Sequence, residues 1–105
     1  MKRFDVVLVS LDPTMGSEIK KSRPCVVVSP DEMNQWLQAI IVAPMTSTKR
    51  NYPTRVSVLF DGKSGDIALD QIRTIDKKTI LKTLGSIDSQ TSVEVSEILV
   101  EMFTV

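Results

Sequence analysis

The stretch Phe4–Ser29, FDVVLVSLDPTMGSEIKKSRPCVVVS, decides the fold of this chain. Its two ends, Phe4–Leu11 and Pro24–Ser29, are short valine-rich runs typical of β-strands. Because both alternating faces of Phe4–Leu11 are mostly apolar, we expect this strand in the middle of a sheet or barrel. The loop between them, Asp12–Pro24, is much longer than the roughly 2–5 residues of a hairpin connection. Long polar loops on a rigid scaffold often carry binding or catalytic residues, so this loop is the first candidate for a functional segment.

After this stretch the chain alternates strand-like runs with polar connections. We expect further strands at Gln38–Ala43, Thr54–Phe60, Ile67–Ile72 and around Lys82–Leu84. Other expected segments are a short helix capped by Asp31, a polar loop Pro44–Pro53, a hairpin turn Asp61–Asp66 and a helical turn Asp76–Thr79. We expect a final helix that is capped by Asp88 or Ser89 and runs to about Phe103, because five apolar residues recur there at helical spacing. These residues are Val95, Ile98, Leu99, Met102 and Phe103.

Length and pattern together predict one mainly β (α+β) domain over residues 1–105. Five or six short strands and a C-terminal helix indicate a small, mainly antiparallel barrel or curled sheet, with the helix over one opening or face. No apolar run has the length of a membrane span, and the N-terminus lacks the features of a signal peptide. A single cysteine, Cys25, excludes an internal disulfide. We therefore expect a cytoplasmic protein with no membrane segment.

The absence of histidine excludes several kinds of site. The chain has no histidine residue, so histidine metal sites, Ser-His-Asp triads and Cys-His dyads cannot form. Any acid–base chemistry must use carboxylates, lysine, arginine, tyrosine, hydroxyls or water. Cys25 lies inside a valine-rich strand, so we expect it to be buried rather than reactive. Trp36 is expected to cover the core or to contact a second subunit.

Charge is balanced overall, with 13 basic and 13 acidic residues, but it is unevenly distributed along the chain. The basic groups are Lys20, Lys21 and Arg23; Lys49, Arg50 and Arg55; and Arg73, Lys77, Lys78 and Lys82. If these groups converge on one face, a site for a polyanion can exist on a neutral protein. The alternative is that they are solvated charges spread over the surface.

Three polar groupings follow or precede strands and are candidates for a site. Glu18 and Arg23 share the long loop, where they form either a phosphate-binding and proton-accepting pair or a plain ion pair. The hydroxyls of residues 46–48 precede two bases, which suits phosphate binding as well as turn capping. Asp70 and Gln71 end an apolar strand, where they either bond to a neighbouring loop or face a site.

Taken in order, these segments resemble the MazF/PemK family of type II toxin–antitoxin ribonucleases. The segments that carry the resemblance are FDVVLVSLDPTMGSE, RPCVVVSPDEMN, IIVAPMTS, DIALDQIRTIDKK and LGSIDSQTSVEVSEIL. The resemblance implies a small SH3-like antiparallel barrel of the CcdB/PemK type and a homodimer. It also implies metal-independent cleavage of single-stranded RNA at short recognition sequences, without a cofactor. An antitoxin with an acidic, disordered tail is the implied inhibitor.

The resemblance also implies roles for individual residues. Arg23 and Thr46 match the family's catalytic arginine and threonine, whereas Glu18 and Asp70 are alternative proton acceptors. The residues expected to bind RNA are Ser17, Lys20, Lys21, Ser47, Lys49, Arg50 and Gln71. Some members carry an arginine as the acid where this chain has Ala68, so that version of the mechanism is excluded here. A mechanism built on Arg23 and Thr46 remains available.

Two other functions fit the same pattern. One is a CcdB-like toxin that binds gyrase without catalysis, although the C-terminal EILVEMFTV lacks the tryptophan expected of such toxins. The other is a small-barrel module that holds RNA without cutting it.

Overall fold

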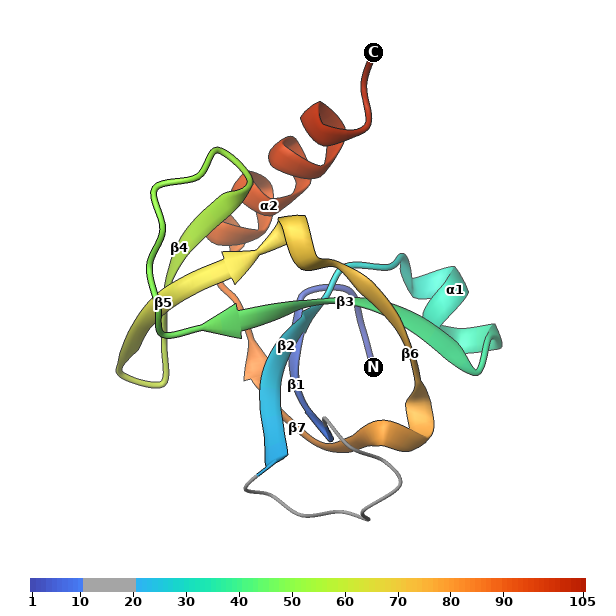
Figure 1. The fold of residues 1–105 in the computed structure, drawn as a ribbon. Helices are drawn as coiled ribbons and strands as arrows, with labels where there is room; N and C mark the ends of the chain where they lie inside the picture. Colours follow the sequence, from blue (N-terminus) through green and yellow to red (C-terminus); the bar gives the residue numbers. More distant parts are fainter. Residues whose placement is uncertain (11–20) are drawn as a thin grey trace.

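A curled antiparallel sheet forms the body of the protein in this computed structural model, which describes residues 1–10 and 21–105 (Figure 1). The elements in chain order are β1 (Asp5–Ser10), β2 (Ser22–Val27), α1 (Asp31–Trp36), β3 (Ala39–Thr46), β4 (Arg55–Phe60), β5 (Lys63–Ala68), the 3-10 turn η3 (Leu69–Gln71), β6 (Arg73–Asp76), the 3-10 turn η4 (Lys77–Thr79), β7 (Ile80–Ser86) and α2 (Ser89–Met102). The strand order is β4-β5-β3-β2-β1-β7, and β6 pairs with β3 off this path.

Strand β1 lies between β2 and β7 and pairs antiparallel with both. Its successive side chains point to opposite faces, and both faces are buried. Val6 belongs to one core cluster, while Val7 and Val9 belong to the other. The expected position of this strand inside the sheet is therefore confirmed.

Strand β3 is the element that curls the sheet. Its first half pairs with β6, its middle pairs with β2, and Met45 and Thr46 at its end pair with β5. One strand thus joins the β4–β5 hairpin to the sheet of β2, β1 and β7, and the result is a half-barrel with α2 lying beside β4 (Figure 1). The predicted fold of a curled antiparallel sheet with a C-terminal helix is confirmed.

Helix α2 closes the first core cluster. Val95 is fully buried there, and three other members of the predicted stripe, Ile98, Leu99 and Met102, pack against it. Burying a side chain of this size contributes roughly 2 kcal/mol. Phe103 follows the last helical residue and is 71% exposed, so its predicted place in the stripe is wrong.

The helix caps differ between the two helices. Asp88 caps α2 as predicted, since its carboxylate accepts a hydrogen bond of 2.7 Å from the Thr91 N–H, which lowers the pKa of Asp88. For α1 the predicted cap is wrong. Pro30 holds the cap position, and Asp31 is the first helical residue. The Asp31 carboxylate instead accepts a hydrogen bond of 2.7 Å from the Arg3 N–H. A contact with the N-terminal segment therefore takes the place of the predicted cap.

The β4–β5 connection is shorter than the predicted six-residue turn. Asp61 and Gly62 have φ angles of 51° and 76°, as the centre of a tight hairpin requires. Strand β5 therefore starts early, at Lys63, and it ends at Ala68. The predicted strand Ile67–Ile72 is wrong in its second half, where η3 takes Asp70 and Gln71 out of the sheet.

Strand boundaries shift elsewhere because pairing overrides local sequence. The predicted strand Pro24–Ser29 is found at Ser22–Val27, and the short strand expected near Lys82–Leu84 is the seven-residue β7. The third strand was predicted to end at Ala43, with the polar loop Pro44–Pro53 after it, and this end is wrong. The strand continues to Thr46 because β5 pairs with the residues beyond the proline.

The predictions for Cys25 and Trp36 have different outcomes. Cys25 is 4% exposed, as predicted, and this burial raises the pKa of its thiol to about 11 although Arg23 and Arg73 act to lower it. Trp36 is 79% exposed, so it does not cover the core; a subunit contact remains a prediction. In the described part of the chain, no helix has the length and apolar character needed to cross a membrane.

Candidate active site

Two hollows meet at Arg23 and Thr46. Arg23 lies on β2, and Thr46 is the last residue of the neighbouring strand β3. Both residues line a larger hollow of about 670 Å³ and a smaller hollow of about 170 Å³. Strand pairing therefore brings together two residues that are far apart in sequence, and the two hollows adjoin each other at these residues.

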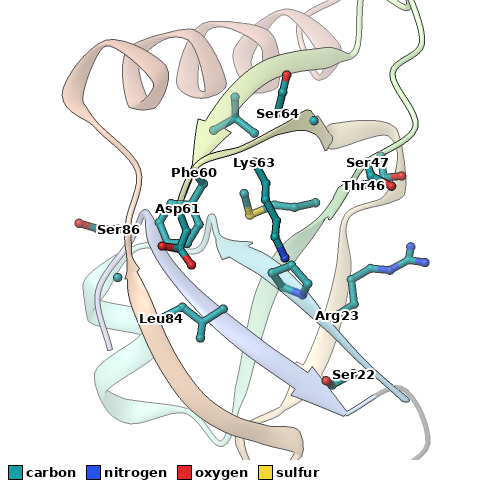
Figure 2. A pocket seen from close by; sticks show the side chains of 15 residues that line it. Ser22, Arg23, Thr46, Ser47, Phe60, Asp61, Lys63, Ser64, Leu84 and Ser86 are labelled. Carbon is teal, nitrogen blue, oxygen red and sulfur yellow. The ribbon is translucent and has the colours of Figure 1, made fainter. Parts of the chain in front are cut away.

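The Arg23 side chain is exposed at the point where β2 enters the sheet. Its backbone is held by pairing opposite Val9 of β1, and its carbonyl lies 3.7 Å from the Cys25 thiol. In Figure 2 the guanidinium points away from the apolar end of the larger hollow, towards the side where Thr46 and Ser47 lie. Its planar donors can fork onto two oxygens of one phosphate.

The Thr46 hydroxyl is fixed at the end of β3. Its Oγ1 accepts a hydrogen bond of 3.1 Å from the Thr48 N–H, and the hydroxyl proton remains available to donate. A Cβ at Gly65 of β5 would lie 2.3 Å from the Thr46 carbonyl oxygen, closer than atoms can approach. Glycine at position 65 therefore lets β5 support the threonine.

The larger hollow has an apolar end formed by β4 and β7. Phe60 and Leu84 line it together with Met45 and Val58, and Lys63 lies between this end and Arg23 (Figure 2). A Cβ at Gly85 would lie 3.3 Å from the Phe60 ring, and the φ angle of Gly85 is +150°. The glycine thus gives the aromatic ring its space at the edge of the hollow.

The smaller hollow is polar and basic. Besides Arg23 and Thr46 it is lined by Thr48, Arg50, Arg55 and Gln71. The Arg55 side chain is only 8% exposed and forms an ion pair with Asp70 of η3. Its Nε donates to Asp70 Oδ1 at 2.7 Å and its Nη2 donates to Oδ2 at 3.2 Å. This bidentate geometry gives the Arg55 guanidinium a defined orientation.

The ion pair shifts the pKa of both partners in the direction that favours their charged forms. The hydrogen bonds from Arg55, helped by one of 3.2 Å from the Thr54 hydroxyl, hold the pKa of Asp70 below its ordinary value. The same carboxylate raises the pKa of Arg55. Arg55 also lies 5.2 Å from the ring centre of Tyr52, at cation–π distance. Asp70 is therefore a carboxylate held by an arginine.

A buried carboxylate fixes the segment that carries Arg50. Asp66 is 2% exposed, and its Oδ2 accepts a hydrogen bond of 2.8 Å from the Arg50 N–H. The backbone after β3 is thereby tied to β5. Arg50 keeps an exposed side chain on a fixed backbone at the rim of the smaller hollow.

The predicted site residues separate into four groups. Arg23, Thr46, Ser47, Arg50 and Gln71 line one or both hollows. Asp70 adjoins the smaller hollow through Arg55, whereas Lys21 and Lys49 are exposed and line neither hollow. Ser17, Glu18 and Lys20 lie outside the described residues. Their functional roles stay predictions.

Sequence reasoning missed several lining residues. Arg55 was noted among the basic groups, but its partner Asp70 is fifteen positions away and joins it only through the pairing of β4 with β5. Phe60 and Leu84 gave no signal beyond their strand pattern, and Lys63 was assigned only to the hairpin turn Asp61–Asp66. Among residues 1–10 and 21–105, no three acidic, cysteine or histidine side chains come together as a metal site requires.

Comparison with known proteins places this geometry in a family. The model of the "PemK-like, MazF-like toxin of type II toxin-antitoxin system" matches residues 2–103. The chain belongs to this PemK/MazF-like family. A protein of Staphylococcus epidermidis named "Endoribonuclease MazF" is 34% identical over 105 residues, covering 94% of this chain and 88% of its own length. A protein of Staphylococcus saprophyticus with the same name is 34% identical over 102 residues, covering 91% and 85%.

Solved structures of PemK/MazF-like toxins share the fold. A mycobacterial endoribonuclease in complex with its cognate antitoxin superposes with a TM-score of 0.81 at 22% identity, over 96% of this chain and 92% of that one. A MazE–MazF structure from Deinococcus radiodurans gives a TM-score of 0.81 at 21% identity, over 100% and 96%. At these identities the likeness demonstrates a common fold.

Proposed function

We propose that this protein is a sequence-specific, metal-independent endoribonuclease that cuts single-stranded RNA, chiefly mRNA, as the toxin of a type II toxin–antitoxin pair. The observation that carries the proposal is the meeting of Arg23 and Thr46 at two adjoining hollows. Membership of the PemK/MazF-like family supports it, because relatives with 34% identity are named endoribonucleases.

The proposed chemistry uses a nucleophile that the RNA itself supplies. The 2′-oxygen attacks the adjacent phosphorus, and the bond from phosphorus to the 5′-oxygen breaks. The products are a 2′,3′-cyclic phosphate and a free 5′-hydroxyl. A base takes the 2′-hydroxyl proton, and the leaving 5′-oxygen takes a proton from water. The protein needs only to hold the groups in line and to stabilise the developing charge.

Arg23 and Thr46 supply that stabilisation in our proposal. The Arg23 guanidinium donates to non-bridging oxygens of the phosphate as their negative charge grows. The Thr46 hydroxyl accepts from the Thr48 N–H, so its own proton is directed to a phosphate oxygen. Both residues project from paired strands, which keeps their relative position fixed.

Glu18 and Asp70 are the two candidates for the base. Asp70 already accepts two hydrogen bonds from Arg55, and its pKa is lowered by them. Both effects weaken it as a proton acceptor. They favour Glu18 as the base and leave Asp70 a supporting role.

The larger hollow supports binding of single-stranded RNA. Unpaired bases are usually recognised by stacking on aromatic side chains and by contacts to their edges. The Phe60 ring lies at the apolar end of this hollow, and the cationic side chain of Lys63 lies between this end and Arg23 (Figure 2). We assign a base of the RNA to this end.

The proposed partners follow from the same features. The antitoxin is expected to cover the arginines of the two hollows with an acidic segment, because such a segment competes with RNA for the same charges. A homodimer is expected as well, and it is supported by the position of β7 at the end of the strand order with Leu84 39% exposed. The cytoplasm, where mRNA is found, is the expected compartment.

One experiment tests the proposal directly. Long RNA is incubated with the purified protein in excess EDTA, and the ends of the fragments are sequenced. We expect cuts within one short sequence that leave cyclic phosphate and 5′-hydroxyl ends, and no cut when the scissile nucleotide is 2′-deoxy. Intact RNA would overturn the proposal. RNA binding without cleavage would then indicate a non-cleaving module, and binding to gyrase would indicate a CcdB-like toxin.

A further inference from the structure

The smaller hollow holds more positive charge than cleavage of one phosphate requires. Three arginines line it, Arg23, Arg50 and Arg55, with hydroxyl and amide groups from Thr46, Thr48 and Gln71. Like charges that gather in one hollow repel each other unless an anion or a carboxylate compensates them. Asp70 compensates Arg55. Arg23 and Arg50 have exposed side chains at this hollow, and a bound anion would reduce the repulsion between them.

Contacts with two carboxylates define where Arg55 and Arg50 lie in the smaller hollow. Arg55 is almost completely buried and held by Asp70 through two hydrogen bonds. The backbone of Arg50 is held by the buried carboxylate of Asp66. One carboxylate thus orients the Arg55 guanidinium, and the other fixes the backbone from which the exposed Arg50 side chain extends.

The position of the smaller hollow relates it to the site of cleavage. Arg23 and Thr46 line both hollows, and in Figure 2 the Arg23 guanidinium points away from Phe60 and Leu84. An RNA strand with a base at the apolar end and its scissile phosphate at Arg23 continues towards the smaller hollow. A mainly polar lining with several cationic donors suits a phosphate better than a base.

We propose that the smaller hollow binds the phosphate next to the one that is cleaved, with Arg50 and Arg55 as its cationic ligands and Asp70 as the residue that positions Arg55. This second phosphate site rests on the proposed ribonuclease function and extends it. It gives Asp70 a positioning role instead of that of the base.

The test measures binding of an RNA that cannot be cut. A short RNA with the mapped cleavage sequence carries a 2′-deoxy nucleotide at the cut, and further versions replace one phosphate at a time by an uncharged methylphosphonate. Affinity is measured against salt concentration for the wild type and for the double variant Arg55→Gln/Asp70→Asn, which keeps the net charge. Loss of one phosphate contact reduces the salt slope by about 0.7 for a single strand.

We expect the double variant to bind about 10-fold more weakly, as for loss of a charged hydrogen bond. Methylphosphonate at the phosphate next to the cut should weaken the wild type by a similar factor and should weaken the variant no further. Lys78→Gln is the matched control, because Lys78 is an exposed cation that lines neither hollow. Thermal unfolding of each variant establishes that it is folded.

The single variant Asp70→Asn tests the role of the carboxylate. If Asp70 only positions Arg55, the Asp70→Asn variant should have a KM for RNA that is several-fold higher than that of the wild type. Its pH–rate profile should keep the acidic limb. Loss of that limb, together with a turnover rate reduced by about two orders of magnitude or more, would make Asp70 the base and overturn its assignment. Wild-type affinity and salt slope in the double variant would overturn the second phosphate site. Failure of the wild type to cut RNA would instead overturn the proposed function.

Discussion

The larger and smaller hollows share Arg23 and Thr46 but differ in everything else around these residues. The larger hollow ends in Phe60 and Leu84, whereas the smaller one is lined by arginines, hydroxyls and an amide. The first surface suits the flat face of a base and the second suits the charge of the backbone. In our proposal, Arg23 and Thr46 therefore connect the surface that recognises a base with the surface that recognises the RNA backbone.

The largest effect is expected from removing a residue that lines both hollows. Arg23→Ala should slow the cleavage step by roughly 100-fold or more, by analogy with loss of one donor to a developing oxyanion. Single-turnover cleavage of the mapped RNA measures this effect. Because Arg23 is exposed, the melting temperature should stay close to that of the wild type. Cleavage by this variant at the wild-type rate would exclude a catalytic role for Arg23.

A smaller effect is expected from changes confined to the larger hollow. Phe60→Leu keeps apolar volume and removes the aromatic face, so KM should rise about 5-fold or more if a base stacks there. Phe60→Trp should retain the wild-type KM. Leu59→Ala is the control, since Leu59 is the neighbour of Phe60 on β4, is 73% exposed and faces the other way. Equal KM values for the leucine and tryptophan variants would argue against stacking.

The smallest effect concerns the stability that the Arg55–Asp70 pair adds. The pKa of Asp70 is lower in the folded protein than its ordinary value, so the stabilisation is present above the unfolded pKa of about 4. It is lost as the pH falls through the folded pKa. Asp70→Asn should therefore lower the unfolding midpoint in urea at pH 7, and the gap to the wild type should close below about pH 4. A gap that is constant down to about pH 2 would exclude this linkage.

Much of the fold could be predicted because it depends on local pattern. Valine alternation in Phe4–Leu11 placed a strand with two buried faces, and the spacing of Val95, Ile98 and Leu99 placed the core side of α2. The burial of Cys25 followed from its valine neighbours. These features need only the period of a strand or helix and the preference of apolar side chains for the interior.

The errors lie where a distant segment competes with local pattern. The Asp31 carboxylate bonds to Arg3 instead of capping its helix, and β3 continues beyond Pro44 because β5 is there to pair with it. In each case the deciding contact is long-range.

The candidate site divides in the same way. The sequence by itself determined which residues have the right chemistry, namely an arginine before a proline, a hydroxyl after an apolar strand and clusters of basic side chains. Only the tertiary structure decided that Arg23 and Thr46 lie at the junction of two hollows and that Asp70 is held by Arg55. The physical reason is that side-chain chemistry belongs to the residue, whereas proximity and the pKa of a paired carboxylate depend on strand pairing across the whole sheet.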